Sequence, residues 1–290
     1  MKNGITLGGY IDSIKGENIP EEAKKRLIGG AYKLFGIDQK TGIHNYTFLV
    51  GRLGEMIDGS QRPPASELSI ALYDLDKFGR YSKNPYSVPL GDRVIKAFAR
   101  TCGDGMRRKI DFAARYGGDE NVTVHLKTSK QAAAEIAENI RRNLSSLIFD
   151  YHNTAENINE QVGVTASCGV GSVDDVEQIK ILHSVDGNQL LLGFLRDKYA
   201  ELIKDFGKRT GIKDEKVDFY LSELREMARH YLEENDLSLV LTPREALVHP
   251  AHSKKLRNYM AVESFIGEVD RRGLQKAKSE GGNRVVILDQ

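Results

Sequence analysis

Four carboxylates in two short segments are the residues of this sequence best suited to chemistry. Asp74 and Asp76 end the alternating apolar run "ELSIALYDLD", and Asp119 and Glu120 directly follow two glycines in "RYGGDEN". Carboxylates that converge repel each other unless a proton or a divalent cation lies between them. Hard oxygen ligands of this kind suit Mg²⁺ or Mn²⁺ carrying a nucleoside triphosphate. The metal would neutralise the α-phosphate and the charge that develops during in-line attack by a ribose 3′-hydroxyl.

The two glycines lie between two segments with strand patterns, "DFAARY" and "ENVTVHLK", which predicts a β-hairpin. Gly117 and Gly118 would let the backbone approach a nucleotide where a side chain would not fit. In the second segment apolar residues alternate with Thr123 and His125, and Asn121 falls in the same phase. We therefore expect Asn121 to lie on a solvent-exposed face of its strand.

Strand and helix patterns alternate along the segments that must position these carboxylates. Apolar periodicity predicts a short helix from Pro20 to Gly36, a helix carrying Phe48, Leu49, Leu53 and Ile57, a strand over "ELSIALYDLD", a helix over 91–103, the hairpin, a helix over about 129–148 that Thr128 and Gln131 would cap, and a strand over "QVGVTASCGVGSV". The order β-α-β-β-α-β is a ferredoxin-like arrangement. It should bring Asp74 and Asp119 to one shared metal ion, with no lysine ion pair in the gap.

Residues 174–265 have a different pattern. Two stretches are strongly helical, "QLLLGFLRDKYAELI" and "KVDFYLSELREMARHYLEEN", and strand signals are almost absent. We interpret this region as a helical insertion. The chain then closes with a helix through "VDRRGLQKAKSEGG" and a strand over "NRVVILD".

The composition of the chain argues against several classes of protein. The 290 residues carry a net charge of +1, which argues against a binder of duplex nucleic acid. Only two cysteines are present, so no disulfide framework is expected and a reducing cytoplasm is the predicted location. We find no apolar run near the roughly 20 residues that a membrane span needs, and no signal-peptide pattern at the N-terminus.

Several motifs, in order, resemble the GGDEF family of diguanylate cyclases. "YDLDKF" followed by "ARYGGDEN" carries the likeness first. "DQKTGIHNYTFL" resembles the family pattern D-x-L-T-G-L-x-N-R-x-x-F, "LGDRVIKAFA" resembles G-D-x-V-L-x-x-x-A, and "VGVTASCGVG" resembles V-T-x-S-x-G. "VDRRGLQKAKSEGGNRVV" is similar to A-D-x-A-L-Y-x-A-K-x-x-G-R-N-R-V.

This resemblance implies an α+β fold, a ferredoxin-like palm of the GGDEF type with an inserted helical subdomain. The cyclase domain would cover 37–173 plus 266–290, after an N-terminal segment and helix over 1–36, and the insertion 174–265 would split it. The implied activity is the metal-dependent condensation of two GTP molecules into cyclic di-GMP. Each chain would hold one triphosphate, so the resemblance implies a homodimer.

The resemblance also implies roles for individual residues. Asp74, Asp119 and Glu120 would be catalytic and would hold the metal with the Leu75 carbonyl. The implied nucleotide-binding residues are Lys77, Phe78, Gly79, Arg80, Tyr81, Asn84, Asp92, Gly117, Gly118, Lys278 and Arg284.

Among the nucleotide-binding residues, the backbone N–H groups from Lys77 to Tyr81 would cradle the β- and γ-phosphates. By the same resemblance Lys278 would contact phosphate and Asp92 would read the guanine edge. Arg108 and Asp111 match the R-x-x-D site through which the product inhibits the family's enzymes.

Several positions depart from the family pattern. Asn121 stands where the family has Phe, and Gly79 stands where a phosphate-binding Lys is expected, with Arg80 as the nearest replacement. Gly282 replaces a phosphate-contacting Arg and leaves Arg284 as the nearest cation.

The base-reading Asn of the family becomes Ser82 or Lys83, unless a one-residue insertion brings Asn84 into that role. These departures leave two alternatives to the cyclase. One is a degenerate module that binds a nucleotide or a cyclic dinucleotide without turnover, and the other is a palm-type cyclase that uses ATP.

Overall fold

The computed structural model describes residues 20–34, 36–60, 67–81, 88–106, 109–153, 157–182 and 250–289. Its strands are β1 (Leu68–Leu75), β2 (Phe112–Arg115), β3 (Glu120–Leu126), β4 (Ile148–Asn153), β5 (Ile158–Gly163), β6 (Ala166–Ser172) and β7 (Val285–Ile287). Its helices are α2 (Glu21–Leu34), α3 (Tyr46–Ser60), α4 (Val88–Asp104), α5 (Lys130–Ser145), α6 (Glu177–Leu182), α10 (Pro250–Val269) and α11 (Gln275–Ser279). Short turns of helix are η1 (Phe78–Arg80), η2 (Val173–Asp175) and the π-helical η4 (Asp270–Leu274).

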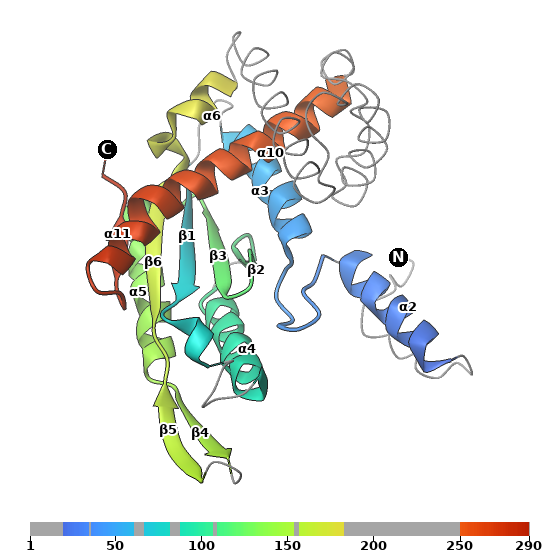
Figure 1. Cartoon of the computed structure of the whole chain (residues 1–290). Helices are drawn as coiled ribbons and strands as arrows, with labels where there is room; N and C mark the ends of the chain where they lie inside the picture. The colour runs from blue at the N-terminus through green and yellow to red at the C-terminus, as the bar shows by residue number, and fades with distance from the viewer. Residues whose placement is uncertain are drawn as a thin grey trace, which may run out of the picture.

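Five strands form one sheet in the order β2-β3-β1-β6-β7 (Figure 1). The pairs β2–β3, β3–β1 and β1–β6 are antiparallel, and β7 joins β6 in parallel. The first four strands of this order have the ferredoxin-like arrangement that the sequence predicted. The α+β palm fold is therefore confirmed.

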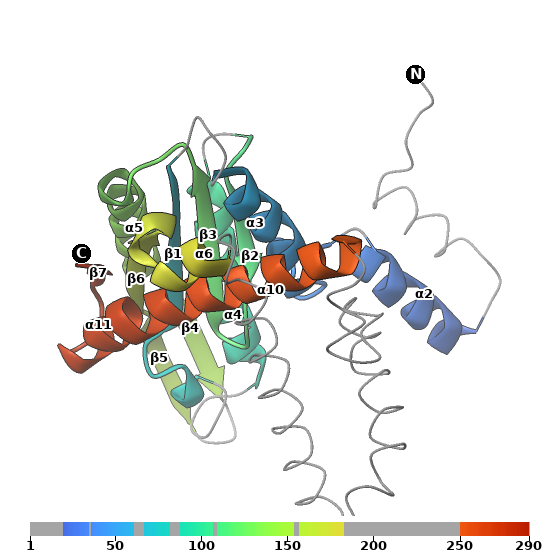
Figure 2. The same cartoon turned by 90° about the horizontal axis from the view of Figure 1, so that it is seen from above.

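Helices cover both faces of the sheet. On one face α3 and α10 pack against each other and against β1, and Figures 1 and 2 show α10 running across the sheet beside α3. On the other face α5 packs against β6, β1 and β7, and α4 packs against β2 and β3. Helix α2 lies apart from the sheet in both views. No helix among the described residues is both long and apolar enough to cross a membrane.

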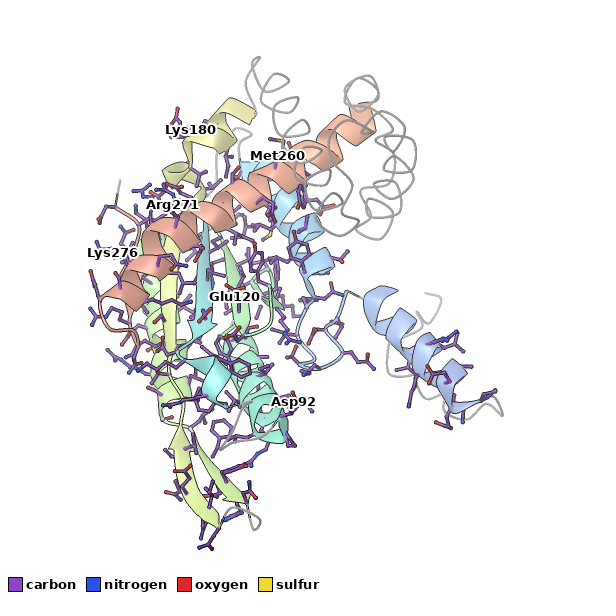
Figure 3. All side chains as sticks on the ribbon, in the orientation of Figure 1. Asp92, Glu120, Lys180, Met260, Arg271 and Lys276 are labelled. Carbon is purple, nitrogen blue, oxygen red and sulfur yellow. The ribbon has the colours of Figure 1, made fainter. Side chains whose placement is uncertain are left out.

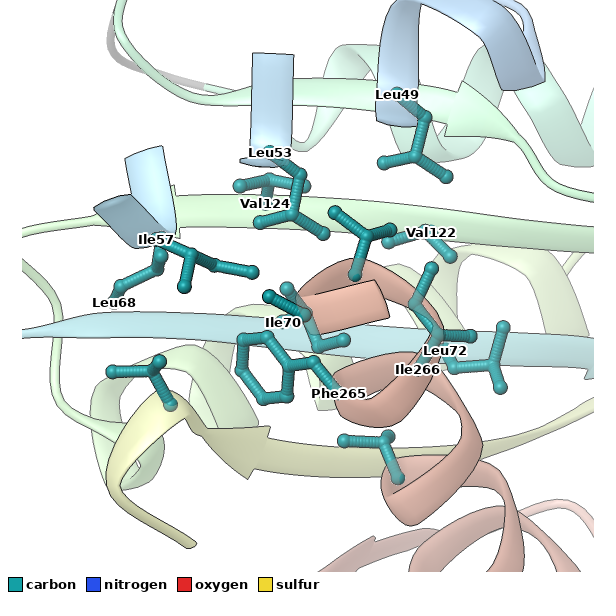
Figure 4. Packing of buried hydrophobic residues seen from close by; sticks show 14 of the residues in the cluster. Leu49, Leu53, Ile57, Leu68, Ile70, Leu72, Val122, Val124, Phe265 and Ile266 are labelled. Atoms are coloured by element: carbon teal, nitrogen blue, oxygen red, sulfur yellow. The ribbon is translucent and has the colours of Figure 1, made fainter. Parts of the chain in front are cut away.

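The core on the α3–α10 face contains the apolar residues that the sequence placed on alternate positions of β1. Figure 4 shows this cluster, in which the buried side chains come from four elements: Leu49, Leu53 and Ile57 of α3, Leu68, Ile70 and Leu72 of β1, Val122 and Val124 of β3, and Phe265 and Ile266 of α10. Because α10 supplies buried side chains from Met260 onward, the last helix enters this core before residue 266. The domain limits expected from the sequence stay a prediction.

The opposite face of β3 is buried, contrary to the expectation of a solvent-exposed face. Asn121, Thr123 and His125 are 3%, 0% and 0% exposed. The alternation of polar and apolar residues was real, but α4 packs against the polar side of β3. Tyr73 and Thr123 hydroxyls lie 3.3 Å apart there, so polar groups of neighbouring strands partner each other inside the fold.

Two local predictions also need correction. The segment "QVGVTASCGVGSV", predicted as one strand, is divided between β5 and β6. The β4–β5 pair was not predicted, and Figure 1 shows it extending beyond the main sheet. The N-cap of α5 is Ser129, whose side chain accepts from Ala132 N–H; Thr128 instead donates to the Leu126 carbonyl. The two long helices predicted between 183 and 249 lie outside the described residues.

Truncation of one α10 side chain should test whether this helix belongs to the core of the palm. We expect Phe265→Ala to lower the free energy of unfolding by about 3–5 kcal/mol, because it removes a fully buried aromatic ring. Leu27→Ala on α2, where the side chain is 45% exposed, is the matched control and should change it by less than about 0.5 kcal/mol. Denaturant unfolding measures both, and equal values for the two variants would contradict the packing.

Candidate active site

The register of β1 and β3 brings the predicted catalytic carboxylates together. Asp74, near the end of β1, is the direct partner of Glu120, the first residue of β3. The next residue of β1, Leu75, donates its N–H to the Asp119 carbonyl at 3.3 Å. Residues from two segments that lie 45 positions apart therefore meet at one end of the sheet, which is where the sequence predicted them.

Crowding and burial change the acidity of this group. Burial raises the pKa of Asp74; the nearby Lys278 ammonium lowers it, and Asp119 and Asp76 raise it further. Burial likewise raises the pKa of Glu120, and the charges of Asp74 and Asp119 add to that effect. Both carboxyls therefore ionise less readily than usual, and a bound cation would favour their ionised form.

A hard divalent cation fits this donor set. The carboxylates of Asp74, Asp119 and Glu120, with the Leu75 carbonyl, offer the oxygen ligands that Mg²⁺ and Mn²⁺ prefer. Within the described part of the chain, no three acidic, histidine or cysteine side chains already surround one point as metal ligands. The chemistry of the donors matches the cation, and their side chains would have to turn toward it.

Lys278 lies closer to the carboxylates than the sequence hypothesis allowed. Its Nζ is 2.9 Å from Asp74 Oδ2, so a lysine ion pair does occupy one of the predicted metal ligands. The Lys278 side chain is 35% exposed. The Asp74 side chain is only 14% exposed, so this ion pair is partly buried, and a metal ion or a phosphate would have to replace one of its partners.

Asp76, the other acid at the end of β1, has a different role. Its carboxylate accepts hydrogen bonds from Thr165 Oγ1 at 2.7 Å, Ser167 Oγ at 2.6 Å and the Asn283 backbone N–H at 3.0 Å. These bonds join β1 to β6 and to the turn before β7. Asp76 therefore anchors the C-terminal turn, a role that could not be predicted from the sequence because its partners lie far away in the chain.

Gly282 is part of this anchor. It has φ +73°, and a Cβ at this position would lie 3.0 Å from Asp76 Oδ1. A side chain here would therefore meet both backbone strain and the carboxylate. The replacement of the family's arginine by Gly282 is consistent with the close approach of the turn to Asp76.

A cavity of about 550 Å³ opens beside Asp74. It is lined by Asp74, Asp76, Lys77, Arg80, Thr165, Lys278, Gly281, Gly282 and Asn283. Three cationic side chains and a glycine-rich turn make it suited to phosphate groups. Of the expected phosphate-binding residues, Lys77, Arg80 and Lys278 are thus brought together.

The turn from Lys77 to Tyr81 differs in detail from the expected phosphate cradle. The N–H groups of Arg80 and Tyr81 donate to the carbonyls of Lys77 and Phe78, so the turn itself uses them. Tyr81 is fully buried, and its hydroxyl donates to the Gly163 carbonyl at 2.9 Å. The Arg80 guanidinium lies 4.7 Å from the centre of the Tyr81 ring, which holds this cation at the cavity wall.

Arg115 holds the hairpin turn, a contact that the sequence analysis missed. Its Nε donates to the Gly117 carbonyl at 3.0 Å and one terminal nitrogen donates to the Gly118 carbonyl at 2.7 Å. The other terminal nitrogen lies 3.3 Å from both carboxylate oxygens of Asp38. A Cβ on Gly117 would come within 2.6 Å of Glu120 Oε2, so a side chain there would displace the Glu120 carboxylate.

Other predicted residues lie outside the cavity. Arg284 forms an ion pair with Glu280 at 2.9 Å. Asp111 is 9% exposed and accepts from Leu126 N–H at 3.3 Å. Its predicted partner Arg108, like Asn84, lies outside the described residues.

Asp92 projects from α4 (Figure 3). Its carboxylate pairs with Lys40 at 2.7 Å. Asn121, which replaces the family's Phe, is buried and donates its side-chain N–H to Cys102 Sγ at 3.7 Å. Burial raises the pKa of the Cys102 thiol to about 12, so Asn121 meets an uncharged thiol.

Removal of the Asp76 carboxylate should show how strongly the C-terminal turn depends on it. We expect Asp76→Ala to lower the free energy of unfolding by about 2–4 kcal/mol, because hydrogen bonds to a charged acceptor contribute about 1.5–3 kcal/mol each and are not additive. Asp104→Ala, which removes an exposed carboxylate from the end of α4, is the control. A loss in Asp76→Ala no larger than in the control, measured by urea unfolding, would contradict the anchoring role.

Comparison with known proteins identifies the family. The family model described as "Diguanylate cyclase, GGDEF domain" matches residues 36–188, more than half of the 290-residue chain. The chain is 31% identical over 140 residues to "Response regulator PleD" of Caulobacter vibrioides, across 48% of this chain and 30% of that relative. It is 34% identical over 116 residues to "Diguanylate cyclase A" of Treponema denticola, across 39% of this chain and 29% of that relative. The chain thus spans under a third of the length of these relatives.

A comparison with solved structures supports the fold. One of them is the coiled coil and GGDEF domain of DgcB from Caulobacter crescentus in complex with c-di-GMP, with a TM-score of 0.53, 16% identity, and coverage of 92% of this chain and 93% of that one. The motifs, the sheet order and the family match agree. The chain belongs to the family of diguanylate cyclase GGDEF domains.

Proposed function

We propose that this protein condenses two molecules of GTP into cyclic di-GMP with release of two pyrophosphates. The observation that carries the proposal is the pairing of Asp74 with Glu120 beside a cavity lined by Lys77, Arg80 and Lys278. Acidic ligands for a cation and basic ligands for phosphates thus adjoin each other. Membership of the diguanylate cyclase family supports the choice of GTP as the substrate.

Each residue of the site has a chemical task in this proposal. Asp74, Asp119 and Glu120, with the Leu75 carbonyl, would hold Mg²⁺ or Mn²⁺, which neutralises charge on the α-phosphate when it is bound. Lys278 would leave Asp74 for a triphosphate oxygen. The raised pKa of Glu120 suits a group that accepts the proton of the attacking 3′-hydroxyl.

The reaction joins two nucleotides, and each chain offers one such site. We therefore propose that two copies face each other with antiparallel sites, so that the 3′-hydroxyl held by one chain attacks the α-phosphate held by the other. The product-inhibition role of Arg108 and Asp111 stays a prediction. The burial of Asp111 counts against its direct contact with the product.

A second candidate is a module that binds the nucleotide or the cyclic dinucleotide without turnover. The ion pair between Lys278 and Asp74 favours it, because it neutralises a predicted metal ligand. The loss of the family's phosphate-binding Lys at Gly79 and Arg at Gly282 points in the same direction. This candidate requires nucleotide binding without formation of pyrophosphate.

Substitution of the carboxylates distinguishes the two candidates. The protein should form cyclic di-GMP from GTP with Mg²⁺ or Mn²⁺, and Asp74→Asn or Glu120→Gln should reduce that rate by about 10²–10⁴-fold, the usual contribution of a positioned acid or base. Product formation is followed by mass spectrometry with GTP and, in parallel, ATP. Asp104→Asn, an exposed acid on α4, serves as the control and should keep the rate.

Absence of any cyclic product from the unsubstituted protein, together with calorimetric GTP binding, would overturn the enzyme proposal in favour of the binding module. Absence of both would overturn both candidates.

Turnover and protein stability should depend on pH in opposite directions. Because the pKa values of Asp74 and Glu120 are raised, metal binding and turnover should be lost on acidification at a higher pH than an ordinary carboxyl would give. The free energy of unfolding of the metal-free protein should change with pH in the opposite direction. Between the ordinary pKa of such a carboxyl in the unfolded chain and its raised pKa in the folded protein, the folded state binds more protons than the unfolded state. The free energy of unfolding therefore falls as the pH rises through that window.

Glu120→Gln removes one of these charges, so it should raise the free energy of unfolding at neutral pH, by less than about 1 kcal/mol because the group is partly exposed to solvent. Rate profiles and thermal unfolding across pH, without and with Mg²⁺, measure both effects. A rate that stays constant down to the pH range of ordinary carboxyls would contradict the raised pKa values.

A further inference from the structure

Lys40 forms an ion pair with the carboxylate that the family resemblance assigns to base recognition. Lys40 Nζ lies 2.7 Å from Asp92 Oδ1, and the two side chains are 40% and 38% exposed. Lys40 belongs to the segment "DQKTG", where the family pattern D-x-L-T-G has leucine. A cationic donor therefore replaces an apolar side chain directly beside Asp92.

The turn that carries Lys40 is held in place. Asp38 Oδ1 accepts from the Thr41 N–H at 2.9 Å and from its hydroxyl at 2.6 Å, and the Gly42 N–H donates to the Asp38 carbonyl at 2.8 Å. The Asp38 carboxylate also binds Arg115. Lys40 thus belongs to a turn that is stabilised by its own hydrogen bonds and connected to the β2–β3 hairpin by Arg115.

Arg115 also contacts the turn next to the carboxylates of the candidate site. Arg115 donates to the Gly118 carbonyl, one residue before Asp119. It is also close enough to Asp92 to contribute, after Lys40 and Lys96, to lowering the pKa of that carboxyl. Arg115 thus connects the Asp38 turn, which carries Lys40, with the hairpin turn, while the cationic cavity adjoins Asp74 at the end of β1.

Guanine offers both kinds of partner that this pair needs. Its O6 and N7 atoms are acceptors, and lysine is one of the side chains that bind them most often. Its N1–H and N2–H groups are donors suited to a carboxylate. Adenine presents the opposite pattern at positions 6 and 1, so an ammonium and a carboxylate set for guanine would each meet a group of the wrong kind.

We propose that Lys40 is a specificity-determining residue, which donates to the O6 atom of guanine while Asp92 accepts from its N1–H and N2–H groups. This inference rests on the proposed function, because it takes Asp92 as the base-reading carboxylate. Lys40 supplies a polar base contact where "FGRYSKN" lacks the family's asparagine at its usual place. Base recognition in this chain then comes from an ion pair held by the Asp38 turn.

Substitution of Lys40 separates base recognition from a surface ion pair. Lys40→Leu should weaken GTP binding by about 5- to 100-fold, the effect of losing one specific base contact. Lys40→Arg keeps the donor and should restore most of the affinity. Lys96→Leu removes the same charge one helical turn from Asp92 and is the matched control, which should bind as the unsubstituted protein does. Thermal unfolding should report equal stability for all of these proteins, because the pair is exposed.

Two analogues locate the contact on the base. In 6-thio-GTP a sulfur replaces the O6 acceptor, and inosine triphosphate lacks the 2-amino donor. The unsubstituted protein should bind both analogues more weakly than GTP. Lys40→Leu should no longer distinguish 6-thio-GTP from GTP, while it still discriminates against inosine triphosphate, whose missing donor faces Asp92.

Calorimetry with Mg²⁺ measures these affinities without requiring turnover. If the protein binds GTP but makes no product, the cyclase proposal fails while the role of Lys40 is still tested. Unchanged GTP affinity in Lys40→Leu, tighter GTP binding in that variant, or no binding of GTP by the unsubstituted protein would each overturn the inference.

Discussion

The pairing of β1 with β3 is the interaction on which the candidate site depends. In this register Asp74 lies opposite Glu120, and the Leu75 N–H binds the Asp119 carbonyl. A shift by one residue would send every side chain of a strand to the other face. Both faces carry a packed core, so such a shift would bury the wrong side chains on both. Apolar packing thus determines the register, and the register holds the carboxylates together against their mutual repulsion.

The C-terminal segment completes the same end of the sheet through one carboxylate. Asp76 binds two hydroxyls of the β6 region and the backbone of Asn283, and Gly282 allows that approach. The turn thereby stays beside β1, with Lys278 one turn earlier in the chain. Because α10 contributes to the core next to α3, packing and site assembly depend on each other. The two acids of "DLD" thus differ: Asp76 anchors the fold, and the proposed function assigns Asp74 to the metal.

Two ion pairs, Lys278–Asp74 and Lys40–Asp92, lie near the hairpin. Each joins a lysine to an acid that the family resemblance assigns to substrate or metal. The Lys40–Asp92 pair is exposed on both sides and contributes little to stability, whereas Asp74 in the other pair is only 14% exposed. In the proposed function both lysines exchange these partners for groups of the nucleotide. The site therefore combines rigid elements, the sheet and the two anchored turns, with side chains that can change partners. This division is expected where binding must be reversible but the reacting groups must stay positioned.

The sequence was enough to predict the order of the strands and helices of the main sheet, the hairpin and the family, because apolar periodicity and motif spacing are local properties. It also located Asp74 and Glu120 correctly, since strand order follows from that alternation. The three-dimensional fold was needed to show that the polar face of β3 carrying Asn121 is buried, because burial depends on which helices cover that face. It also decided the anchoring by Asp76 and the role of Arg115. Such contacts join residues distant in the chain, and the spacing of residues in a sequence carries no record of which side chains meet.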